Sequence, residues 1–213
     1  MMVDFNHMIW DRYESENGLE NIKYCPICGF SGEFVSDSNR ENSIKDRCPK
    51  CNSAERNRLY WIYFEKDGLL KSAKSIIHVS PDKSSRTRLS MNKDIKYRVV
   101  GCENLANFQF EVASTDYIIA NYVLDRIDNP ELILKRMFRA LKKGGKAMVS
   151  LYFKKTKKDD GSIVSSPESL SLALKEVGFK VSILTSEDLC GYCISKICGI
   201  KPSSFIVLAV KDE

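Results

Sequence analysis

Short apolar runs alternate with amphipathic stretches along the chain beyond residue 60. The apolar runs are rich in β-branched and aromatic residues and lie at 75–79, 97–101, 116–120, 146–152, 179–184 and 204–210. Such runs, bounded by polar and turn residues, are typical of β-strands. Apolar residues at helical spacing occupy 53–70, 132–141 and 167–177, and a polar helix is expected to run through Leu89. This alternation predicts a mostly parallel sheet covered by helices on both faces, an α/β fold of the Rossmann-like, doubly wound type.

Several of the predicted helices carry end signals. Gly68 lies near the end of the first helix, and Gly178 follows the last one. The helix over 132–141 is expected to stop at the Lys-Lys-Gly-Gly run over 142–145, because basic residues and glycine favour a helix terminus. No clear long helix separates the last two predicted strands. We therefore expect these strands to form an antiparallel pair at one edge of the sheet.

A parallel sheet of this kind binds ligands beyond the carboxyl ends of its strands. In this chain Ser80, Gly101 and Asn121 lie at the ends of the first three predicted strands of the sheet. The pattern therefore predicts a pocket near these three residues.

Two Cys-x-x-Cys pairs stand in the N-terminal quarter of the chain. Each pair has a proline after its first cysteine, and Gly29 or Asn52 follows its second cysteine and can take the positive φ that such turns require. Two turns of this form supply four thiolates for one tetrahedral zinc ion. The residues between them suffice for a short β-hairpin, so the spacing predicts a structural zinc ribbon. Its ligands would be Cys25, Cys28, Cys48 and Cys51.

Other interpretations of the cysteines stay open. The two pairs could be unrelated free thiols, whereas a catalytic zinc is disfavoured, because four cysteines close the coordination shell. A second group, Cys190, Cys193 and Cys198, offers three sulfurs without a nearby histidine. We expect half-buried loop cysteines there, with a redox pair or a weak metal site as the alternative.

Composition narrows the class of protein. Hydrophobic residues make up 43% and charged residues 29% of the chain, as in ordinary folded soluble proteins. No apolar stretch is long enough to span a bilayer, and the N-terminus lacks the order of a signal peptide. We therefore expect a cytoplasmic protein without membrane contact, whose cysteines are metal ligands or buried thiols rather than disulfides. The net charge of +5 falls short of that of a dedicated nucleic-acid binder.

Four segments carry recognisable motifs. The run from Cys48 to Leu59 (CPKCNSAERNRL) is similar to Cys-Pro-x-Cys-Gly-Ser-x-Glu-Arg-x-Arg-Leu, and the run from His78 to Asp82 (HVSPD) is similar to His-Val-Ala-Pro-Glu. The segment 116–127 resembles Phe-Asp-x-x-x-x-Asn-x-Val-Leu-Glu-His-Val, and 138–145 resembles an Arg-x-Leu-Lys-Pro-Gly-Gly turn. Together these segments resemble class I S-adenosylmethionine-dependent methyltransferases, specifically a bacterial subgroup with an N-terminal zinc ribbon.

The resemblance implies an N-terminal segment and zinc ribbon over 1–58 and a methyltransferase-like α/β domain over 59–213. It implies S-adenosylmethionine as cofactor, bound by His78, Ser80, Pro81, Asp82, Glu103, Asn121 and Tyr122. The subgroup's acidic residue after the second strand falls on Gly101 here, and Glu103 is the nearest replacement. His78 also suits a buried strand-end histidine, and the aromatic Tyr122 can equally close the core.

The chain is shorter than the family pattern at one point. Only residues 102–115 separate the second and third predicted strands of the sheet, too few for the additional strand, helix and adenine-flanking loop that the family places there.

The resemblance and this departure from it leave two hypotheses for the function. One is a methyltransferase of unknown acceptor with no assigned catalytic residue, since the cofactor sulfonium is already activated. The other is a methyltransferase-like scaffold that has lost cofactor binding and acts through protein or RNA contacts.

The zinc ribbon could itself contact a partner. Its basic residues would bind phosphates of RNA, and they are Arg47, Lys50, Arg56 and Arg58. The alternative is that Arg56 and Arg58 pair with neighbouring acids such as Glu55 or Glu65.

Overall fold

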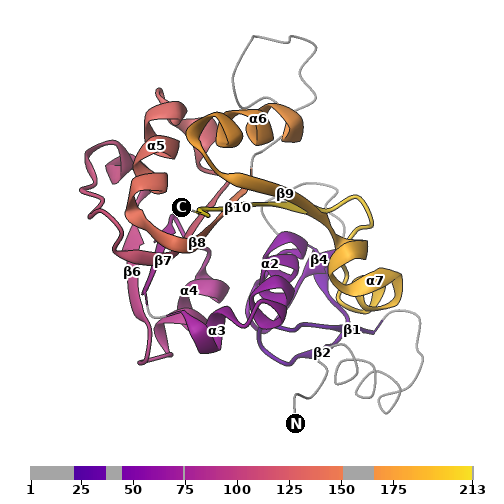
Figure 1. Cartoon of the computed structure of the whole chain (residues 1–213). Helices are drawn as coiled ribbons and strands as arrows, with labels where there is room; N and C mark the ends of the chain where they lie inside the picture. Colours follow the sequence, from indigo (N-terminus) through magenta and orange to yellow (C-terminus); the bar gives the residue numbers. More distant parts are fainter. Residues whose placement is uncertain (1–21, 37–44, 74, 151–165, 213) are drawn as a thin grey trace. The chain divides into compact units, whose positions relative to one another are not determined.

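The computed structural model describes residues 22–36, 45–73, 75–150 and 166–212. The chain divides into two compact units, and Figure 1 labels their elements. Unit 1 comprises Met1–Ser72, Asp82–Met91 and Thr185–Phe205. Unit 2 comprises Ala73–Pro81, Asn92–Leu184 and Ile206–Glu213.

Unit 2 is built on a sheet with the strand order β6-β5-β7-β8-β10-β9. Its strands are β5 (Ser75–Val79), β6 (Lys96–Val100), β7 (Thr115–Asn121), β8 (Leu141–Ser150), β9 (Lys180–Thr185) and β10 (Phe205–Val210). Strand β5 pairs in parallel with β6 and β7, and β7 pairs in parallel with β8. Strand β10 is antiparallel to β8, and β9 lies beside it. The predicted mostly parallel sheet with antiparallel pairing towards one edge is therefore confirmed.

Helices α5 (Pro130–Ala140) and α6 (Pro167–Val177) pack side by side in unit 2 (Figure 1). Each begins with a proline, and the side chain of Asn129 or Ser166 accepts a backbone N–H of the first turn. Gly178 ends α6 with a φ of 112°, as its position in the sequence predicts. Phe179 then packs edge to face on Phe138, with ring centroids 4.9 Å apart. The contact between the Phe138 and Phe179 rings holds the end of α6 against α5.

The helix α5 ends at Ala140, one residue before the predicted end, but the predicted glycine terminator and the predicted strand start at Lys146 are wrong. Leu141 already has an extended backbone and pairs with Thr115 of β7. The next paired residue of β8 is Lys146, so the Lys-Lys-Gly-Gly run forms a bulge inside the strand. Gly144 takes a φ of 72° there, and its N–H donates to the Lys211 carbonyl over 2.7 Å. The glycine therefore serves a strand bulge rather than a helix cap.

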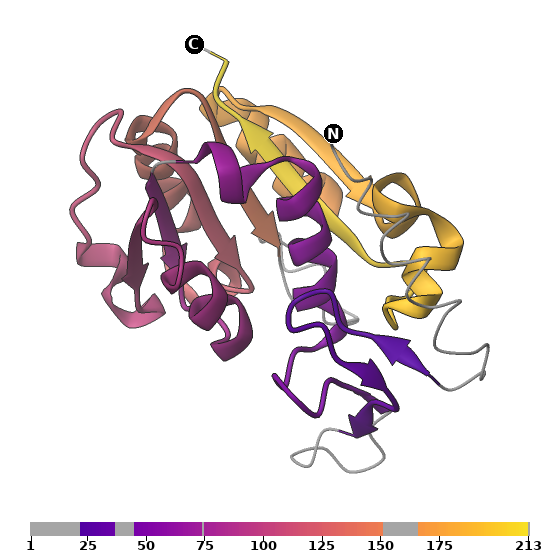
Figure 2. The ribbon, with the colours of Figure 1, turned by 90° about the horizontal axis from the view of Figure 1, so that it is seen from below.

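Unit 1 contains the cysteine turns and the helix that follows them (Figure 2). Strand β1 (Lys23–Tyr24) pairs with β2 (Ser31–Gly32), and β3 (Val35–Ser36) pairs with β4 (Lys45–Arg47), both antiparallel. The predicted hairpin between the cysteine turns corresponds to β3 and β4.

The helical stretch predicted over 53–70 is two helices. Helix α2 (Glu55–Lys66) ends shortly before Gly68, which has a φ of 70°, and α3 (Leu69–Ser72) follows. Helix α4 (Lys83–Ser90) is the predicted polar helix. The side chains from 57 to 64 in α2 are all buried. A helix buried on every side does not show the usual amphipathic pattern.

Helix α7 (Ser186–Ile197) lies where no long helix is predicted. Thr185 and Asp188 cap its start reciprocally, which is the local signal that marks it. Gly191 interrupts the helix with φ 72° and ψ 169°. The glycine at the kink and the nearby cysteine, tyrosine, isoleucine and serine residues all have low helix propensity. The sequence therefore shows no clear helical pattern here.

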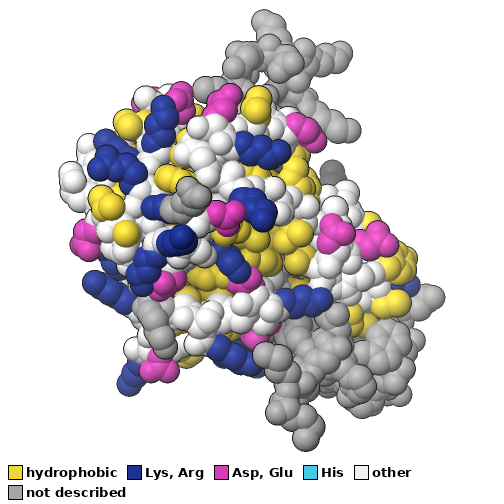
Figure 3. Space-filling view, in the orientation of Figure 1, with side chains coloured by type: hydrophobic (Ala, Val, Ile, Leu, Met, Phe, Trp, Pro, Cys, Tyr) yellow, Lys and Arg dark blue, Asp and Glu magenta, His cyan; other side chains and the backbone are white. Residues whose placement is uncertain are grey.

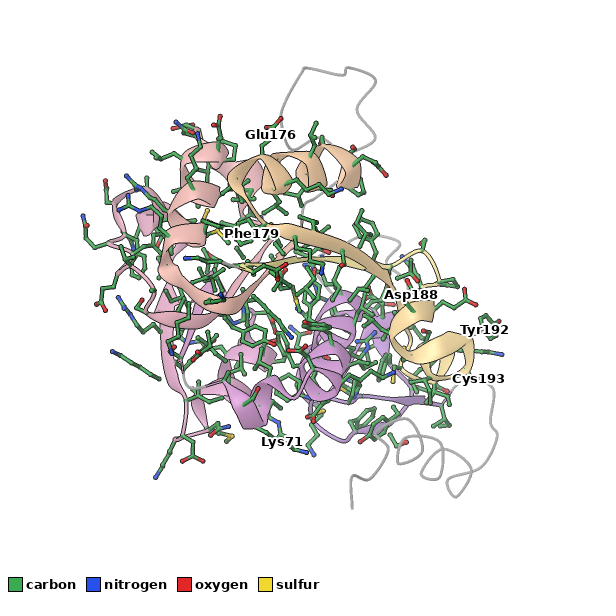
Figure 4. The ribbon with its side chains drawn as sticks, viewed as in Figure 1. Lys71, Glu176, Phe179, Asp188, Tyr192 and Cys193 are labelled. Atoms are coloured by element: carbon green, nitrogen blue, oxygen red, sulfur yellow. The ribbon has the colours of Figure 1, made fainter. Side chains whose placement is uncertain are left out.

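The prediction of half-buried loop cysteines is consequently wrong. Cys190 and Cys193 belong to α7, and Cys198 is its C-terminal cap. Cys190 and Cys198 are buried, whereas Cys193 is exposed and points away from the helix beside Tyr192 (Figure 4). The Cys190 sulfur lies 3.2 Å from the Ser195 hydroxyl oxygen. In the described part of the chain these three sulfurs form no metal cluster.

Candidate functional site

The four ribbon cysteines converge on one point in unit 1. Their sulfur atoms all lie within 4.8 Å of one another. The Sγ atoms of Cys25 and Cys51 are 3.6 Å apart, and those of Cys28 and Cys48 are 3.5 Å apart. A tetrahedral zinc with bonds of about 2.3 Å to sulfur needs sulfur separations of about 3.8 Å. The cluster therefore matches the size and the donor chemistry of a structural zinc site.

Backbone hydrogen bonds preorganise the two turns. In the first, the Gly29 N–H donates to the Cys25 carbonyl over 2.9 Å; in the second, the Asn52 N–H donates to the Cys48 carbonyl over 2.8 Å. Gly29 and Asn52 have φ values of 70° and 59°, in agreement with the sequence prediction. The side chains are thus directed inward by the local backbone.

The electrostatics of the cluster depend on burial and on thiol hydrogen bonds. Hydrogen bonds from the Cys48 and Cys51 thiols hold the pKa of Cys25 well below its ordinary value. Burial raises the pKa of Cys28 to about 11. The Ser53 hydroxyl lies 3.3 Å from the Cys25 sulfur and contributes a further hydrogen bond. Four clustered thiols cannot all ionise without a cation, and a metal ion supplies that charge.

Arg58 connects the second cysteine turn to the end of α7 within unit 1. Its side chain is 0% exposed. The guanidinium donates to the Cys198 carbonyl over 2.6 Å, the Gly199 carbonyl over 3.0 Å and the Ser53 carbonyl over 2.8 Å. It also lies 4.5 Å from the ring centroid of Phe34. Arg58 therefore cannot contact an RNA phosphate, and its partners are carbonyls rather than the acids that the sequence suggested.

The other basic ribbon residues differ from Arg58. Arg47 donates to the Asn52 carbonyl over 3.2 Å, and Lys50 donates to the Cys28 carbonyl over 3.4 Å. Both contacts are exposed, so these cations remain near the surface. On the face shown in Figure 3, Lys and Arg side chains are interspersed with Asp and Glu rather than gathered into one patch.

Unit 2 contains the predicted ligand edge. Strand β5 is flanked by β6 on one side and by β7 on the other. The strand that follows β5 in the chain is therefore added on one side of it, and the later strands are added on the other side. Such a switch point leaves a crevice beyond the carboxyl ends of the strands. Ser80 and Tyr122 follow β5 and β7 directly, with φ values of 45° and 56°. These two non-glycine residues in the left-handed region mark sharp turns at the ends of two neighbouring strands.

Ser80 joins the ends of β5 and β6. Its N–H donates to the Val100 carbonyl, and its hydroxyl oxygen accepts the Cys102 N–H, both over 2.8 Å. The loop is therefore fixed beside Gly101, where the sequence predicted a pocket.

The Glu103 carboxylate stands over Gly101. A Cβ atom added to Gly101 would lie 1.9 Å from one Glu103 carboxylate oxygen and 2.8 Å from the other. The carboxylate thus occupies the volume that a side chain at 101 would fill. Glu103 is exposed and accepts a hydrogen bond from the Asn104 amide over 3.2 Å. An acidic group is therefore present at the end of β6, although it comes from two positions later in the chain.

His78 lies inside the sheet and is 4% exposed. Its Nδ1 atom is 3.0 Å from the Tyr97 hydroxyl oxygen, and the two rings meet edge to face. Asp82 belongs to unit 1, where its carboxylate accepts the Ser85 N–H over 3.0 Å and caps α4. Pro81 connects the two units in the chain and is half-buried.

At the end of β7, Asn121 and Tyr122 are half-buried. The Ser150 hydroxyl donates to the Asn121 side-chain carbonyl over 3.1 Å, and the Tyr122 N–H donates to the Ser150 carbonyl over 2.9 Å. Ser150 is the last described residue of β8 and was not predicted as a site residue. Its position beside Asn121 of the neighbouring strand is the signal that could have found it.

The segment between β6 and β7 has the predicted short form. All of it is described, and it contains a 3₁₀ helix, η1 (Cys102–Asn107), and no strand. Strand β6 is therefore the edge of the sheet.

Comparisons with known proteins give a consistent family. A profile described as "Methyltransferase domain" matches residues 17–182. A search of curated proteins finds no match. In the part of the chain that the structure describes, no helix is both long and apolar enough to cross a membrane.

Solved structures share the fold. A S-adenosylmethionine-dependent methyltransferase from Archaeoglobus fulgidus is 14% identical with a TM-score of 0.50, over 76% of this chain and 96% of that chain. A phosphoethanolamine N-methyltransferase from Haemonchus contortus, in complex with S-adenosyl-L-methionine, is 14% identical with a TM-score of 0.49, over 74% of this chain and 53% of that chain. The chain thus spans about half the length of the Haemonchus protein. At 14% identity, the likeness to the Archaeoglobus protein shows the fold alone.

Proposed function

Because the chain belongs to the methyltransferase-domain family, we propose that it is a class I S-adenosylmethionine-dependent methyltransferase that binds its cofactor at the carboxyl ends of β5, β6 and β7. The observation that carries this proposal is the Glu103 carboxylate standing over Gly101. Doubly wound nucleotide sites bind ribose hydroxyls through an acid at the end of the second strand. Glu103 provides that acid from a neighbouring position.

The other residues at this edge would contact the rest of the cofactor or position the strand ends. Backbone groups of Ser80 and Pro81 would bind the amino-acid end of the cofactor, and Asn121 and Tyr122 would contact it from β7. His78, held by Tyr97, would position the end of β5 from inside the sheet. These roles are supported by where each strand ends and by the hydrogen bonds that hold each loop.

When bound, S-adenosylmethionine supplies a methyl group that its sulfonium has already activated. The protein then needs to exclude water and to align the acceptor atom with the methyl carbon and the sulfur. We assign no general base. Ser150 would act by orienting the Asn121 amide through their hydrogen bond.

We also propose that the four ribbon cysteines bind one zinc ion with a structural role, as in the bacterial subgroup with an N-terminal ribbon. Four cysteines within 4.8 Å support this, because they leave no open coordination position. Thiolate ligands of this kind persist in a reducing compartment, so we place the protein in the cytoplasm.

Calorimetric titration with S-adenosylmethionine and S-adenosylhomocysteine tests the cofactor proposal. Glu103→Gln should weaken both by about tenfold or more, because a hydrogen bond to a charged group is worth about 1.5 to 3 kcal/mol. Glu111→Gln is the matched control. It neutralises an acid that faces the opposite end of the strands, beside Arg98, and should leave the affinity unchanged.

A scaffold without cofactor is the second candidate. The absence of a strand between β6 and β7, where every residue is described, favours it because the adenine side of the crevice loses a wall. Such a protein would act through RNA or protein contacts, with Arg47 and Lys50 as the accessible ribbon cations. No heat and no thermal shift at millimolar cofactor would favour this candidate. Binding that depends on Glu103 would exclude it.

A further inference from the structure

Unit 2 contains a cavity outside the predicted cofactor edge. Its volume is about 450 Å³, within the range of small-molecule sites. One wall is the extended segment after η1, and the other is the side of α5. The lining residues are Ala106, Asn107, Phe108, Gln109, Phe110, Arg136 and Arg139. None of these residues is among the predicted cofactor contacts.

Two arginines give the cavity its charge. Arg136 and Arg139 are three residues apart on α5, so their side chains share one helix face. Arg136 donates to the Ala106 carbonyl, which holds one guanidinium against the opposite wall. The Arg139 side chain is exposed, and no described residue forms a hydrogen bond or ion pair with it. No lining side chain is acidic. A guanidinium fork in this setting matches phosphate oxygens.

The opposite wall is aromatic. Phe108 and Phe110 meet edge to face, with ring centroids 4.7 Å apart. The Arg98 guanidinium lies 5.1 Å from the Phe108 centroid and steadies that ring, while Arg98 also lies 3.6 Å from Glu111. Both phenylalanines are half-buried, and Gln109 between them is exposed. Aromatic rings beside arginines bind nucleotide bases by stacking, and an exposed amide can hydrogen-bond a base edge.

From these features we infer that the cavity binds a nucleotide, with its phosphate on Arg139 and Arg136 and its base against Phe108 and Phe110. The nucleotide is either free or part of a single-stranded RNA. The lining residues are all different from the proposed cofactor contacts, so this site is separate from the proposed cofactor site and does not depend on it. Contact with RNA or a nucleotide would thus be made by unit 2 rather than by the buried Arg58 of the ribbon.

Fluorescence or calorimetric titration of the full chain tests this site with uridine, uridine 5′-monophosphate and octauridylate. The monophosphate should bind at least tenfold more tightly than uridine, because only it offers a phosphate. Equal binding of the monophosphate and the octamer would identify a free nucleotide as the ligand. Tighter binding of the octamer would identify a strand.

Arg139→Gln should weaken the phosphate-bearing probes by about tenfold and reduce the slope of log affinity against log salt by about one. Arg88→Gln removes an exposed arginine on α4 and serves as the matched control. Phe110→Leu, which keeps an apolar residue in the wall, should weaken the monophosphate severalfold without changing the salt slope.

Three results would overturn the inference. One is no binding of either phosphate-bearing probe to the wild-type chain, and another is equal loss in Arg139→Gln and Arg88→Gln. The third is competition with S-adenosylhomocysteine, which would make the cavity part of the cofactor site. Failure of cofactor binding alone would leave this inference standing, because the probes here contain no cofactor.

Discussion

The guanidinium of Arg58 donates to the carbonyl of Cys198 over 2.6 Å, although 140 positions separate them in the chain. Two further carbonyls complete its fork, from the cysteine turn and from Gly199. Burial lowers the pKa of Arg58, yet the group stays charged at every pH where the protein folds. One buried arginine thus joins the predicted metal turn to a helix that sequence reasoning missed.

Arg58→Met should destabilise the protein by about 3 to 5 kcal/mol, because three buried carbonyls lose their donor. The midpoint of thermal unfolding should fall by about 10 °C. Arg58→Lys should lie between methionine and wild type, since an ammonium cannot reproduce the planar fork. Arg56→Met, two residues earlier and only half-buried, is the control and should cost less than 1 kcal/mol. Equal effects at 56 and 58 would contradict the role given to the Arg58 hydrogen bonds.

Purified protein should contain one zinc ion per chain, measured by elemental analysis. Cys48→Ser should lose the metal and the folded ribbon, because the site requires all four thiolates. Cys193→Ser removes an exposed cysteine outside the cluster and should retain the zinc. A Cys48→Ser protein whose ribbon still unfolds cooperatively without metal would refute the structural role.

Cys190 and Cys198 should resist alkylation in the native state at pH 9, while Cys193 reacts. Burial raises the pKa of both buried thiols above the ordinary thiol value of about 9. The stability contributed by burying these two neutral thiols is therefore complete below pH 9. It is lost as the pH rises towards their folded-state pKa values, because in that range the thiols ionise only in the unfolded chain. Mass spectrometry after iodoacetamide treatment, with and without denaturant, measures this. Rapid native labelling of Cys198 would be incompatible with its burial.

Asp116 joins the starts of three parallel strands. Its carboxylate accepts the Ser75 N–H over 2.8 Å and the Ser75 hydroxyl over 2.9 Å, and it pairs with Lys142 over 2.8 Å. Asp116→Ala should cost about 2 to 3 kcal/mol in urea unfolding, since these donors lose their acceptor. Glu131→Ala breaks only an exposed pair with Lys135 and should cost less than 1 kcal/mol. Similar costs for the two variants would show that the Asp116 network is not structural.

Sequence reasoning succeeded where the determining interactions are local. The cysteine turns and the end of α6 at Gly178 depend on a few adjacent residues, and apolar runs mark the strands. Prediction from the sequence failed where an unusual backbone conformation or packing against a distant segment determines the structure. Gly191 conceals α7, and the bulge around Gly144 depends on pairing with β7 and on the Lys211 carbonyl, which no short window contains.

The candidate sites likewise divide into those that depend on local sequence and those that depend on distant packing. Spacing alone predicted that Cys25, Cys28, Cys48 and Cys51 come together, and the structure places their sulfurs within 4.8 Å of one another. The order of the predicted strands placed Ser80 and Asn121 at one edge. The nucleotide cavity was not predictable, because it exists only where the segment after η1 faces α5. The buried state of Arg58 was equally hidden, since two of its three carbonyl partners lie at the far end of the chain.

Gly101 and Glu103 share one volume, because a Cβ atom at 101 would lie 1.9 Å from a Glu103 oxygen. The Glu103 carboxylate is the tip of an exposed, flexible side chain, so a side chain at 101 would move it aside. An aspartate at 101 would set two like charges side by side unless the Glu103 side chain turned away. The end of β6 therefore accommodates one carboxylate at a time, and either position could carry it.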